Sequence, residues 1–526
     1  MIRPIKTNRK ERAFMSLEQY FLKFRKHIIG QNLEHEINGQ QQKIIYADWT
    51  ASGRLYQPIE NFISYTLGPY VANTHTETNL TGSTMTLAYH DAQKVIKRHV
   101  NACDNDILIT SGAGMTDVVN KFQRILGLRV PERMASQVNF CEADKPVVFI
   151  THMEHHSNQT TWHECDVTLE IVESDNNGLP SFESLEKLLV QYQNRKVKIG
   201  SFTGCSNVTG IKTPYHQLAE IMHQHGGVCF VDFACSAPYV DIDMHPVNKL
   251  QSLDAIFFSP HKFLGGPGSS GVLIFNKSLY KNKVPDHPGG GTVTWTNPWG
   301  EHSFFHNIET REDGGTPGFL QCIRTALAIK VKDAMGTKNI AAREQEIIEY
   351  LMVELAKNEQ VNILEPTVMD RLAILSFYIT NVHYNLVVRL LNDKFGIQTR
   401  GGCSCAGTYG HILLNVDHDT SNQITQQIND GDYCEKPGWI RASFHPTTTN
   451  EEVKFVVQAI NTLTKNIVEW SQEYRFNPAT GDFEKNNTPE DIQQNYVGIK
   501  EFNALCSNET IVESEGNRSM LKRFFR

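Results

Sequence analysis

The 526-residue sequence lacks long apolar runs and has no excess of basic residues. No segment approaches the roughly 18 consecutive apolar residues of a membrane-spanning helix, so we expect no membrane partner. Lys and Arg total 50 against 58 Asp and Glu, a formal net charge of −8. Because phosphate backbones bind basic surfaces, this balance argues against a nucleic-acid partner. At 40% hydrophobic and 21% charged residues, the chain can bury a substantial core.

The sequence also lacks a disulfide framework and a secretory signal. Its 11 cysteines are scattered and odd in number, which favours a reducing compartment, and we expect a cytoplasmic protein. The basic residues 1–12 have no apolar segment behind them, unlike a secretory signal. The alternative of a cleaved organelle transit peptide is disfavoured by Glu11 and by the scarcity of serine.

One stretch, residues 253–271, combines an apolar run, a lysine and a glycine-rich loop. The run Ala255–Phe258 predicts a buried strand, and Lys262 follows it after Ser259 and His261. Burying an unpaired ammonium is costly, whereas a lysine joined as a Schiff base to an aldehyde cofactor is no longer a free ammonium. The glycines let the backbone pass close to a bound cofactor. Taken alone, the stretch is equally compatible with a surface turn and a solvated lysine.

Strands and helical stretches alternate from about residue 105 to 275, which is typical of an α/β domain with a mostly parallel sheet. The expected strands cover residues 106–110, 145–151, 197–202, 228–232, 255–258 and 271–275. Ligands of such sheets bind beyond the carboxyl ends of the strands. Polar clusters follow four of these strands: Ser111–Gly114, His152–Asn158, Cys205–Gly210 and the segment from Asp232. We therefore expect one shared site.

Each cluster also has an ordinary interpretation. The turn Ser111–Gly114 enters an expected helix directly, which aims backbone N–H groups at a phosphate but is also a common strand-to-helix turn. Three histidines within residues 152–156 suggest zinc, but the helical H-E-x-x-H spacing is absent, so a ring over a flat cofactor is favoured. Asp232, at the end of an apolar strand, needs a partner.

The chain divides into four expected segments. An N-terminal extension covers 1–40, a large α/β domain 41–335, a smaller α+β domain 336–471, and a polar C-terminal extension 472–526. The hydroxyl-rich stretch 73–78, which contains His75, is a candidate site wall because loops of this kind carry function.

The motifs, taken in order, resemble the class V aminotransferase family of pyridoxal-phosphate enzymes. They are Ser111-Gly112, Glu154-His155-His156, Ser206-Asn207-Val208 with Gly210, Asp232 with Ala234, Ser259 with His261-Lys262, and Gly315-Thr316-Pro317. Two further motifs are similar to the cysteine desulfurase and selenocysteine lyase branch: Arg400 with Gly402 and Cys405-Ala406, and Arg441-Ala442-Ser443. The resemblance covers roughly residues 44–470 and implies fold type I of the PLP-dependent transferases, with a large and a smaller domain.

The resemblance implies pyridoxal 5'-phosphate (PLP) as cofactor. Lys262 would form the Schiff base and carry the proton at the substrate Cα, and Asp232 would pair with the pyridine nitrogen so that the ring acts as an electron sink. His155 would stack on the ring, and Asn207 would bind its hydroxyl. The phosphate would contact backbone groups of Ala113 and Gly114, the side chains of Ser259 and His261, and Thr316 of a neighbouring subunit in a homodimer.

The same resemblance implies the reaction. Arg441 would bind the substrate carboxylate, which suits its planar fork, with Arg400 and His75 as further substrate contacts. Cys405 would accept sulfur as a persulfide, next to Arg400 and His411, a setting that favours a thiolate. The expected conversion is L-cysteine to L-alanine, with a sulfur-acceptor protein as a further partner.

Three departures from the family pattern bear on the substrate more than on the cofactor. Phe233-Ala234-Cys235 stands where Gly-Ala-Gln is common, Asp48-Trp49-Thr50-Ala51 replaces an asparagine–alanine pair, and Cys403 stands where histidine is common. Cys403 and Cys405 could also form a metal clip, but no second cysteine pair at zinc spacing is present, and we expect no metal. The alternatives are an aminotransferase, a selenocysteine lyase, another PLP-dependent lyase or epimerase, and a non-catalytic PLP-fold binding protein.

Overall fold

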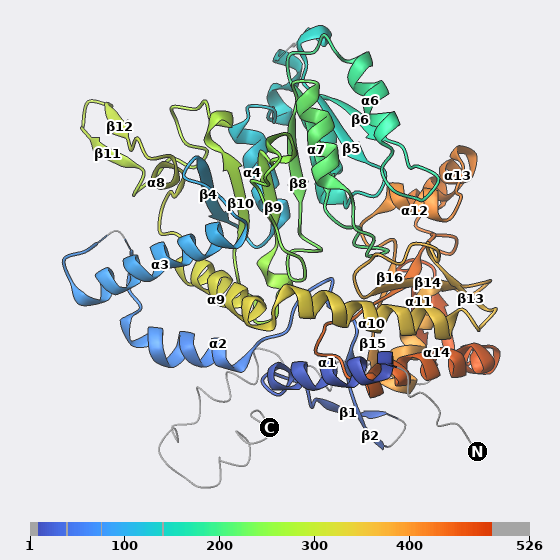
Figure 1. The fold of residues 1–526 in the computed structure, drawn as a ribbon. Coiled ribbons are helices and arrows are strands. Elements are labelled where there is room, and N and C mark those ends of the chain that lie inside the picture. Colours follow the sequence, from blue (N-terminus) through green and yellow to red (C-terminus); the bar gives the residue numbers. More distant parts are fainter. Residues whose placement is uncertain (1–8, 38–39, 75, 139–140, 487–526) are drawn as a thin grey trace.

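The computed structural model describes residues 9–37, 40–74, 76–138 and 141–486. Figure 1 shows two domains, each built around its own sheet, connected by two consecutive long helices, α9 (Phe319–Met335) and α10 (Thr337–Leu355). None of the helices in the described ranges is both long and apolar enough to cross a bilayer.

The large domain contains a seven-stranded sheet. Its strands, in spatial order, are β4 (Asp106–Ser111), β10 (Gly271–Asn276), β9 (Ala255–Phe258), β8 (Val228–Asp232), β7 (Lys198–Thr203), β5 (Val147–Thr151) and β6 (Thr168–Val172). All neighbours pair in parallel except β10, which is antiparallel to both β4 and β9. The prediction of a mostly parallel sheet is confirmed. The strand β6 was not predicted from the sequence; it lies at the edge of the sheet, and its residues are mostly half-buried.

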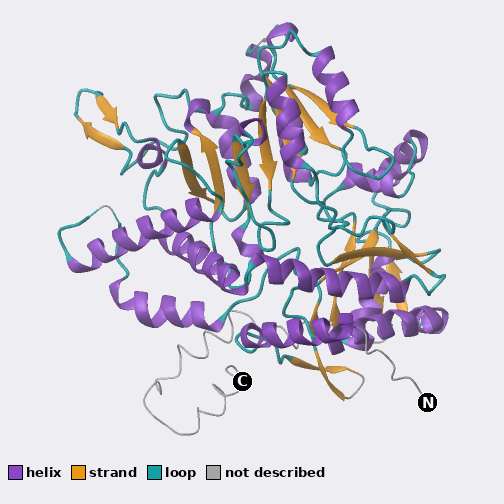
Figure 2. Ribbon diagram, in the orientation of Figure 1, coloured by secondary structure: helices purple, strands orange, loops and turns teal. Residues whose placement is uncertain are grey.

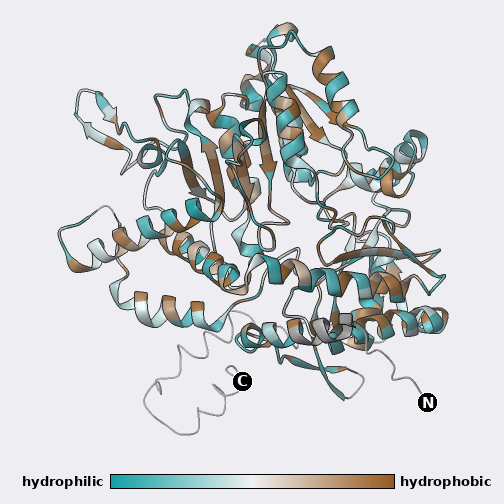
Figure 3. Ribbon diagram, in the orientation of Figure 1, coloured by the Kyte–Doolittle hydropathy of each residue, from teal (hydrophilic) through white to brown (hydrophobic). Residues whose placement is uncertain are grey.

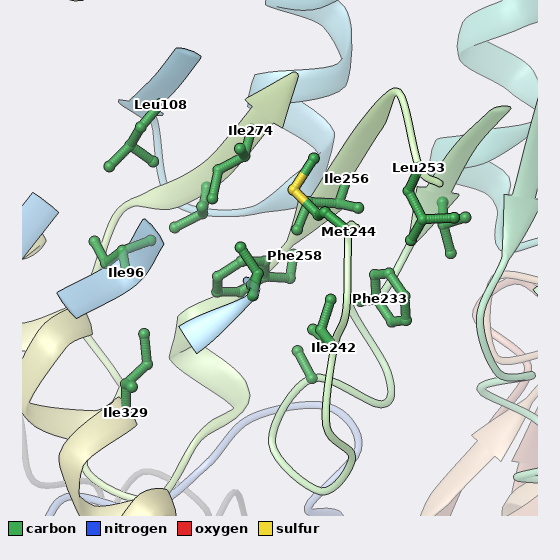
Figure 4. Close-up of a cluster of buried hydrophobic side chains, with 14 of the residues drawn as sticks. Ile96, Leu108, Phe233, Ile242, Met244, Leu253, Ile256, Phe258, Ile274 and Ile329 are labelled. Atoms are coloured by element: carbon green, nitrogen blue, oxygen red, sulfur yellow. The ribbon is translucent and has the colours of Figure 1, made fainter. Parts of the chain in front are cut away.

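Helices cover both faces of this sheet, which explains its nearly continuous apolar strands. One face packs against α3 (Leu80–His99), α6 (Phe182–Gln191), α7 (Tyr215–Gln224) and α9. The other packs against α4 (Met115–Ile125) and the short α5 (Thr160–His163). Figure 3 shows the strands as a hydrophobic layer, and Figure 4 shows side chains of the first face, including Ile256, Phe258 and Ile274.

The small domain has a four-stranded antiparallel sheet. Its strands, in spatial order, are β13 (Val361–Ile363), β14 (Ile374–Ile379), β17 (Trp439–Ser443) and β16 (Arg400–Gly402). Its helices are α11 (Tyr384–Phe395), α12 (Gly407–Leu413), α13 (His418–Asn429) and α14 (Asn450–Ser471). A capping box begins α14: Thr449 accepts from the Glu452 N–H, and the Glu452 carboxylate accepts from the Thr449 N–H.

Both ends of the chain contribute to the small domain. The strand β3 (Ile45–Tyr46) pairs in parallel with β15 (Ile397–Gln398), so the segment that begins the expected large domain lies against the small one. Beyond residue 472, where we expected a polar extension, β18 (Tyr474–Asn477) and β19 (Asp482–Lys485) form a hairpin. Tyr474 is only 7% exposed and joins the small-domain core, so this hairpin packs as part of the small domain.

The remaining elements lie at the periphery. They are α1 (Arg9–Arg25), the hairpin β1 (Glu34–Ile37) and β2 (Gln40–Lys43), α2 (Gln57–Asn61) with a following π-helical turn (Phe62–Leu67), the hairpin β11 (Val293–Thr296) and β12 (His302–Phe304), and α8 (Ile308–Glu312). The first helix ends at Arg25, whose guanidinium donates to the Thr447 carbonyl and the Glu452 carboxylate, so the N-terminal extension is attached to α14.

Candidate active site

Most of the predicted site residues meet between the two sheets. Figure 2 shows loops filling the region between the carboxyl ends of the large-domain strands and the small-domain sheet. The large domain contributes Asp232 at the end of β8, Lys262 after β9, and residues following β4, β5 and β7. The small domain contributes Arg441 from β17 and the loop after β16.

Asp232 and Lys262 are close enough to influence each other's ionisation. Asp232 is 4% exposed, and its Oδ1 accepts a 2.7 Å hydrogen bond from the Ala234 N–H. Burial raises the pKa of Asp232 to about 6, opposed by that hydrogen bond and by the charge of Lys262. Burial lowers the pKa of Lys262 below its ordinary value, opposed by Cys235 and Asp232. The lysine is thus biased toward the neutral amine, which is the nucleophilic form.

His155 lies beside this lysine as a neutral ring. Burial, and next the charge of Lys262, lower the pKa of His155 to about 3. Its Nδ1 accepts a 3.1 Å hydrogen bond from the Ser157 N–H. A neutral imidazole with an orienting contact suits stacking on a flat ring better than ion pairing.

Glu154, which had no predicted role, holds the loop after β5 through hydrogen bonds of its buried carboxylate. It is 1% exposed, and its Oε1 accepts from the Thr151 hydroxyl at 2.6 Å and the Thr203 N–H at 2.8 Å. Its Oε2 accepts from Asn158 at 2.9 Å. Burial raises the pKa of Glu154 to about 7. These bonds join the loop after β5 to the end of β7.

The expected phosphate contacts form a narrow cradle at the N-terminus of α4. The Ser259 hydroxyl accepts from the Met115 N–H at 2.8 Å. A Cβ on Gly114 would lie 3.1 Å from that hydroxyl and 3.6 Å from the His261 ring, so a side chain there would crowd the cradle. The Ala113 N–H donates to the Asp117 carboxylate at 2.8 Å and is therefore already engaged.

His261 shares the cradle as a neutral ring. Burial lowers its pKa to about 4, with a further contribution from Lys262. It therefore offers the cradle a neutral ring rather than a positive charge.

Asn207 connects the two domains. Its side-chain Nδ2 donates to the Ser404 carbonyl at 2.7 Å, and its backbone carbonyl accepts from Arg441 Nη1 at 3.1 Å. Its Oδ1 is buried and has no hydrogen-bond partner among the described residues. A buried acceptor left without a partner is unfavourable, so this atom fits a ligand that donates a proton, as a ring hydroxyl does.

Arg441 and Arg400 share one carboxylate, that of Asp48. Arg441 Nη2 lies 3.0 Å from Asp48 Oδ1, and Arg400 Nη2 lies 2.9 Å from Asp48 Oδ2. Arg441 is 3% exposed, and within the described part of the chain its buried Nε has no hydrogen-bond partner. The predicted carboxylate-binding arginine is therefore held in place while one of its donors stays free.

The loop that carries Cys405 is held in an unusual backbone conformation. Ser404 and Cys405 have φ angles of 51° and 57°, two consecutive non-glycine residues in the left-handed region. His156 binds this loop at two points: its backbone N–H donates to the Cys405 carbonyl at 2.7 Å, and its Nε2 accepts from the Gly407 N–H at 2.9 Å. Cys405 is exposed and influences the ionisation of Lys262.

The second thiol of the loop lies in a different environment. Cys403 packs against an apolar cluster that includes Met153, Tyr409 and Trp439. We expected His411 beside Cys405, but both of its ring nitrogens have partners in the small domain. Nδ1 lies 2.8 Å from the Gly407 carbonyl oxygen, and Nε2 lies 2.8 Å from the Ser421 hydroxyl.

Two predicted residues are not joined to this group. Thr316 is exposed in the loop before α9, and no hydrogen bond within the described ranges connects it to the site. His75 lies outside the described residues.

One group of side chains elsewhere could hold a metal ion. The ligand atoms of Cys103, Asp106 and His245 lie within 4.8 Å of one another. The His245 Nε2 already lies 2.6 Å from Asp106 Oδ2, so a hydrogen bond between these two side chains accounts for their proximity.

Comparisons with known proteins agree with this geometry. The family model "Aminotransferase class-V" matches residues 45–456. A probable cysteine desulfurase of Halalkalibacterium halodurans is 28% identical over 378 residues, covering 71% of this chain and 86% of that protein. A probable cysteine desulfurase of Staphylococcus epidermidis is 29% identical over 435 residues, covering 81% and 93%.

Solved structures share the fold. The apo cysteine desulfurase of Thermococcus onnurineus superposes with a TM-score of 0.67 at 23% identity, covering 85% of this chain and 98% of that one. The S-sulfonic acid form of the cysteine desulfurase CsdA of Escherichia coli gives a TM-score of 0.62 at 21% identity, covering 80% and 95%.

Proposed function

Because this chain belongs to the class V aminotransferases, we propose that it is a PLP-dependent enzyme that converts L-cysteine to L-alanine and retains the sulfur as a persulfide on Cys405. The observation that carries the proposal is the placement of an exposed thiol, on a loop held from both domains, within electrostatic reach of Lys262. The similarity to probable cysteine desulfurases supports it.

The residues present fit PLP. Lys262 supplies an amine biased toward its neutral form, Asp232 a buried carboxyl, and Asn207 a buried acceptor without a partner. Gly114 and Ser259 leave room for a phosphate at a helix N-terminus, where N–H groups favour an anion. When bound, the cofactor would supply an electron sink for the electron pair at the substrate Cα.

The chain's own side chains would perform the remaining work. Arg441 orients the substrate through its carboxylate, and the Lys262 amine takes the proton from Cα and returns it to the product. The Cys405 thiolate attacks the substrate sulfur, so that a sulfur–sulfur bond forms and the carbon–sulfur bond breaks. The electron pair of the broken bond stays with Cβ, which gains a proton and becomes the methyl group of alanine. The neutral ring of His155 would stack on the cofactor when it is bound.

The exposed surface supports a homodimer. Large apolar side chains are exposed on α3, on the π-helical turn and near the β11–β12 hairpin, and Figure 1 shows these segments projecting on one side of the large domain: Tyr65, Leu80, Leu87, Trp295 and Trp299. Exposed large apolar side chains on segments at one side of a molecule suit a surface that a second copy of the chain covers. In such a dimer the exposed Thr316 would reach the phosphate of the neighbouring subunit.

The cellular setting is proposed on two grounds. The ten cysteines in the described ranges are all free, which suits a cytoplasmic location. A persulfide on the exposed Cys405 is within reach of a sulfur-acceptor protein.

Alanine formation from L-cysteine by the purified, PLP-loaded protein tests the proposed reaction. Cys405→Ala should abolish persulfide formation and keep the cofactor absorbance, and Cys403→Ala serves as the matched control because that thiol packs in an apolar cluster. Sulfur release by Cys405→Ala at the wild-type rate would show that Cys405 is not the acceptor. A panel of amino acids read at the cofactor band separates the aminotransferase and selenocysteine lyase alternatives.

A further inference from the structure

Two arginines of the site face each other across neighbouring strands. Arg400 of β16 and Arg441 of β17 are direct partners in the antiparallel register. Like charges at such positions repel each other, because side chains opposite one another on the same face are close neighbours. A pair of this kind needs a compensating anion.

Asp48 is that anion, and it divides its two oxygens between the arginines. Oδ1 accepts from Arg441 Nη2 at 3.0 Å, whereas Oδ2 accepts from Arg400 Nε at 3.0 Å and lies 2.9 Å from Arg400 Nη2. The Asp48 side chain is 12% exposed and that of Arg441 is 4% exposed, whereas that of Arg400 is 52% exposed. The hydrogen bond to Asp48 raises the pKa of Arg400. Charges buried to this degree require pairing.

The cluster therefore presents one net positive charge to the site. Two guanidinium groups and one carboxylate leave a single uncompensated cation, and the unpartnered Nε of Arg441 is a buried donor. The other titratable groups that interact electrostatically with the cluster are Tyr46, His155, Cys235, Lys262 and Cys405. Of the two arginines, the half-exposed Arg400 is the one with surface left to bind a second acidic group.

We propose that Asp48 determines substrate specificity: by cancelling one of two guanidinium charges, it restricts the site to substrates with a single carboxylate. The inference rests on the proposed amino-acid site at Arg441. Without the Asp48 charge, Arg441 and Arg400 would form a two-cation site that fits a dicarboxylate. With it, a second carboxylate would have to displace Asp48 from Arg400.

Isothermal titration calorimetry with butyrate and succinate tests this count of charges. The two probes have four carbons each and differ in carrying one or two carboxylates, and neither has an amine that could react. Asp48→Asn in the PLP-loaded protein should raise the affinity for succinate relative to butyrate at least about tenfold, since one hydrogen bond to a charged group contributes that much or more. Arg400→Gln should weaken butyrate binding, because Asp48 then neutralises Arg441 alone.

The double variant separates charge from structure. Combining Asp48→Asn with Arg400→Gln restores a single cation, so the wild-type preference should return, which a merely structural role of Asp48 would not produce. An unchanged succinate-to-butyrate ratio in Asp48→Asn, or a ratio that stays altered in the double variant, would overturn the proposal. If Asp48→Asn does not fold, Arg400→Gln tests the proposal by itself. A butyrate affinity of Arg400→Gln equal to that of the wild type would then refute the proposal.

Calorimetry requires no turnover, so the two proposals fail independently. A shifted ratio in a protein that forms no alanine from cysteine would refute the proposed reaction alone. Normal alanine formation with an unshifted ratio would refute only the role of Asp48.

Discussion

Replacing Ser404 by glycine should stabilise the protein while impairing sulfur transfer. Ser404 has a φ of 51°, is 8% exposed, and its hydroxyl is buried without a hydrogen-bond partner. Its carbonyl accepts from Asn207 Nδ2, a contact that glycine keeps. The serine side chain therefore adds two unfavourable features to the fold and no visible favourable one.

The magnitude follows from three contributions. The left-handed conformation costs a residue with a Cβ about 1–2 kcal/mol, and a buried hydroxyl without a partner costs about 1–3 kcal/mol. Glycine loses more backbone entropy on folding, which costs about 0.5–1 kcal/mol. The expected net gain in the free energy of unfolding is about 1–4.5 kcal/mol. Because glycine holds the loop less rigidly, persulfide formation on Cys405 should slow.

The assay is chemical denaturation of the apoprotein, with Ser404→Ala as the matched control. Alanine removes the hydroxyl but keeps the strained Cβ, so it should stabilise less than glycine does. A lower free energy of unfolding for Ser404→Gly than for the wild type would refute the reasoning, as would equal effects of glycine and alanine.

Three further predictions concern the site and its support. Arg441→Lys should raise KM for cysteine at least about tenfold, because lysine cannot reproduce the planar donor set; steady-state kinetics checks this, and an unchanged KM contradicts it. The pKa of Asp232 in the folded protein, about 6, exceeds its value in the unfolded chain. The free energy of unfolding of the apoprotein should therefore fall by up to about 3 kcal/mol as pH rises from 4 to 7. Asp232→Asn should abolish this pH dependence, which a comparison of thermal unfolding of the two proteins across this pH range measures. Gly53→Ala should destabilise the protein by more than about 3 kcal/mol and lower PLP retention, because the added Cβ would lie 1.9 Å from the carbonyl oxygen of Phe263, the residue after Lys262. Gly290→Ala is the control, since a Cβ added there has no atom within 4 Å. Equal stability of the two variants would contradict the argument.

Apolar continuity made most of the large sheet predictable. The strand β9 begins and ends where its apolar run does, and β8 extends one residue beyond its run, to Asp232. Residues of a parallel strand covered on both faces need not alternate between apolar and polar. The edge strand β6 escaped prediction because its half-buried residues, among them Glu170, lack that continuity. Pairing of β3 with β15 joins segments about 350 residues apart in the chain, which no local pattern reports.

For the site, the sequence by itself determined which chemical groups are present and that they follow strand ends, because residue type and strand position are local properties. Only the tertiary structure decided what those groups do to one another. It places Asp48 between Arg400 and Arg441, and it lets His156 form hydrogen bonds to the loop of Cys405. It also packs Cys403 against an apolar cluster, whereas Cys405 of the same loop is exposed. Hydrogen bonds and charge pairing depend on distances of about 3 Å between remote residues, and those distances exist only once the two domains have packed together.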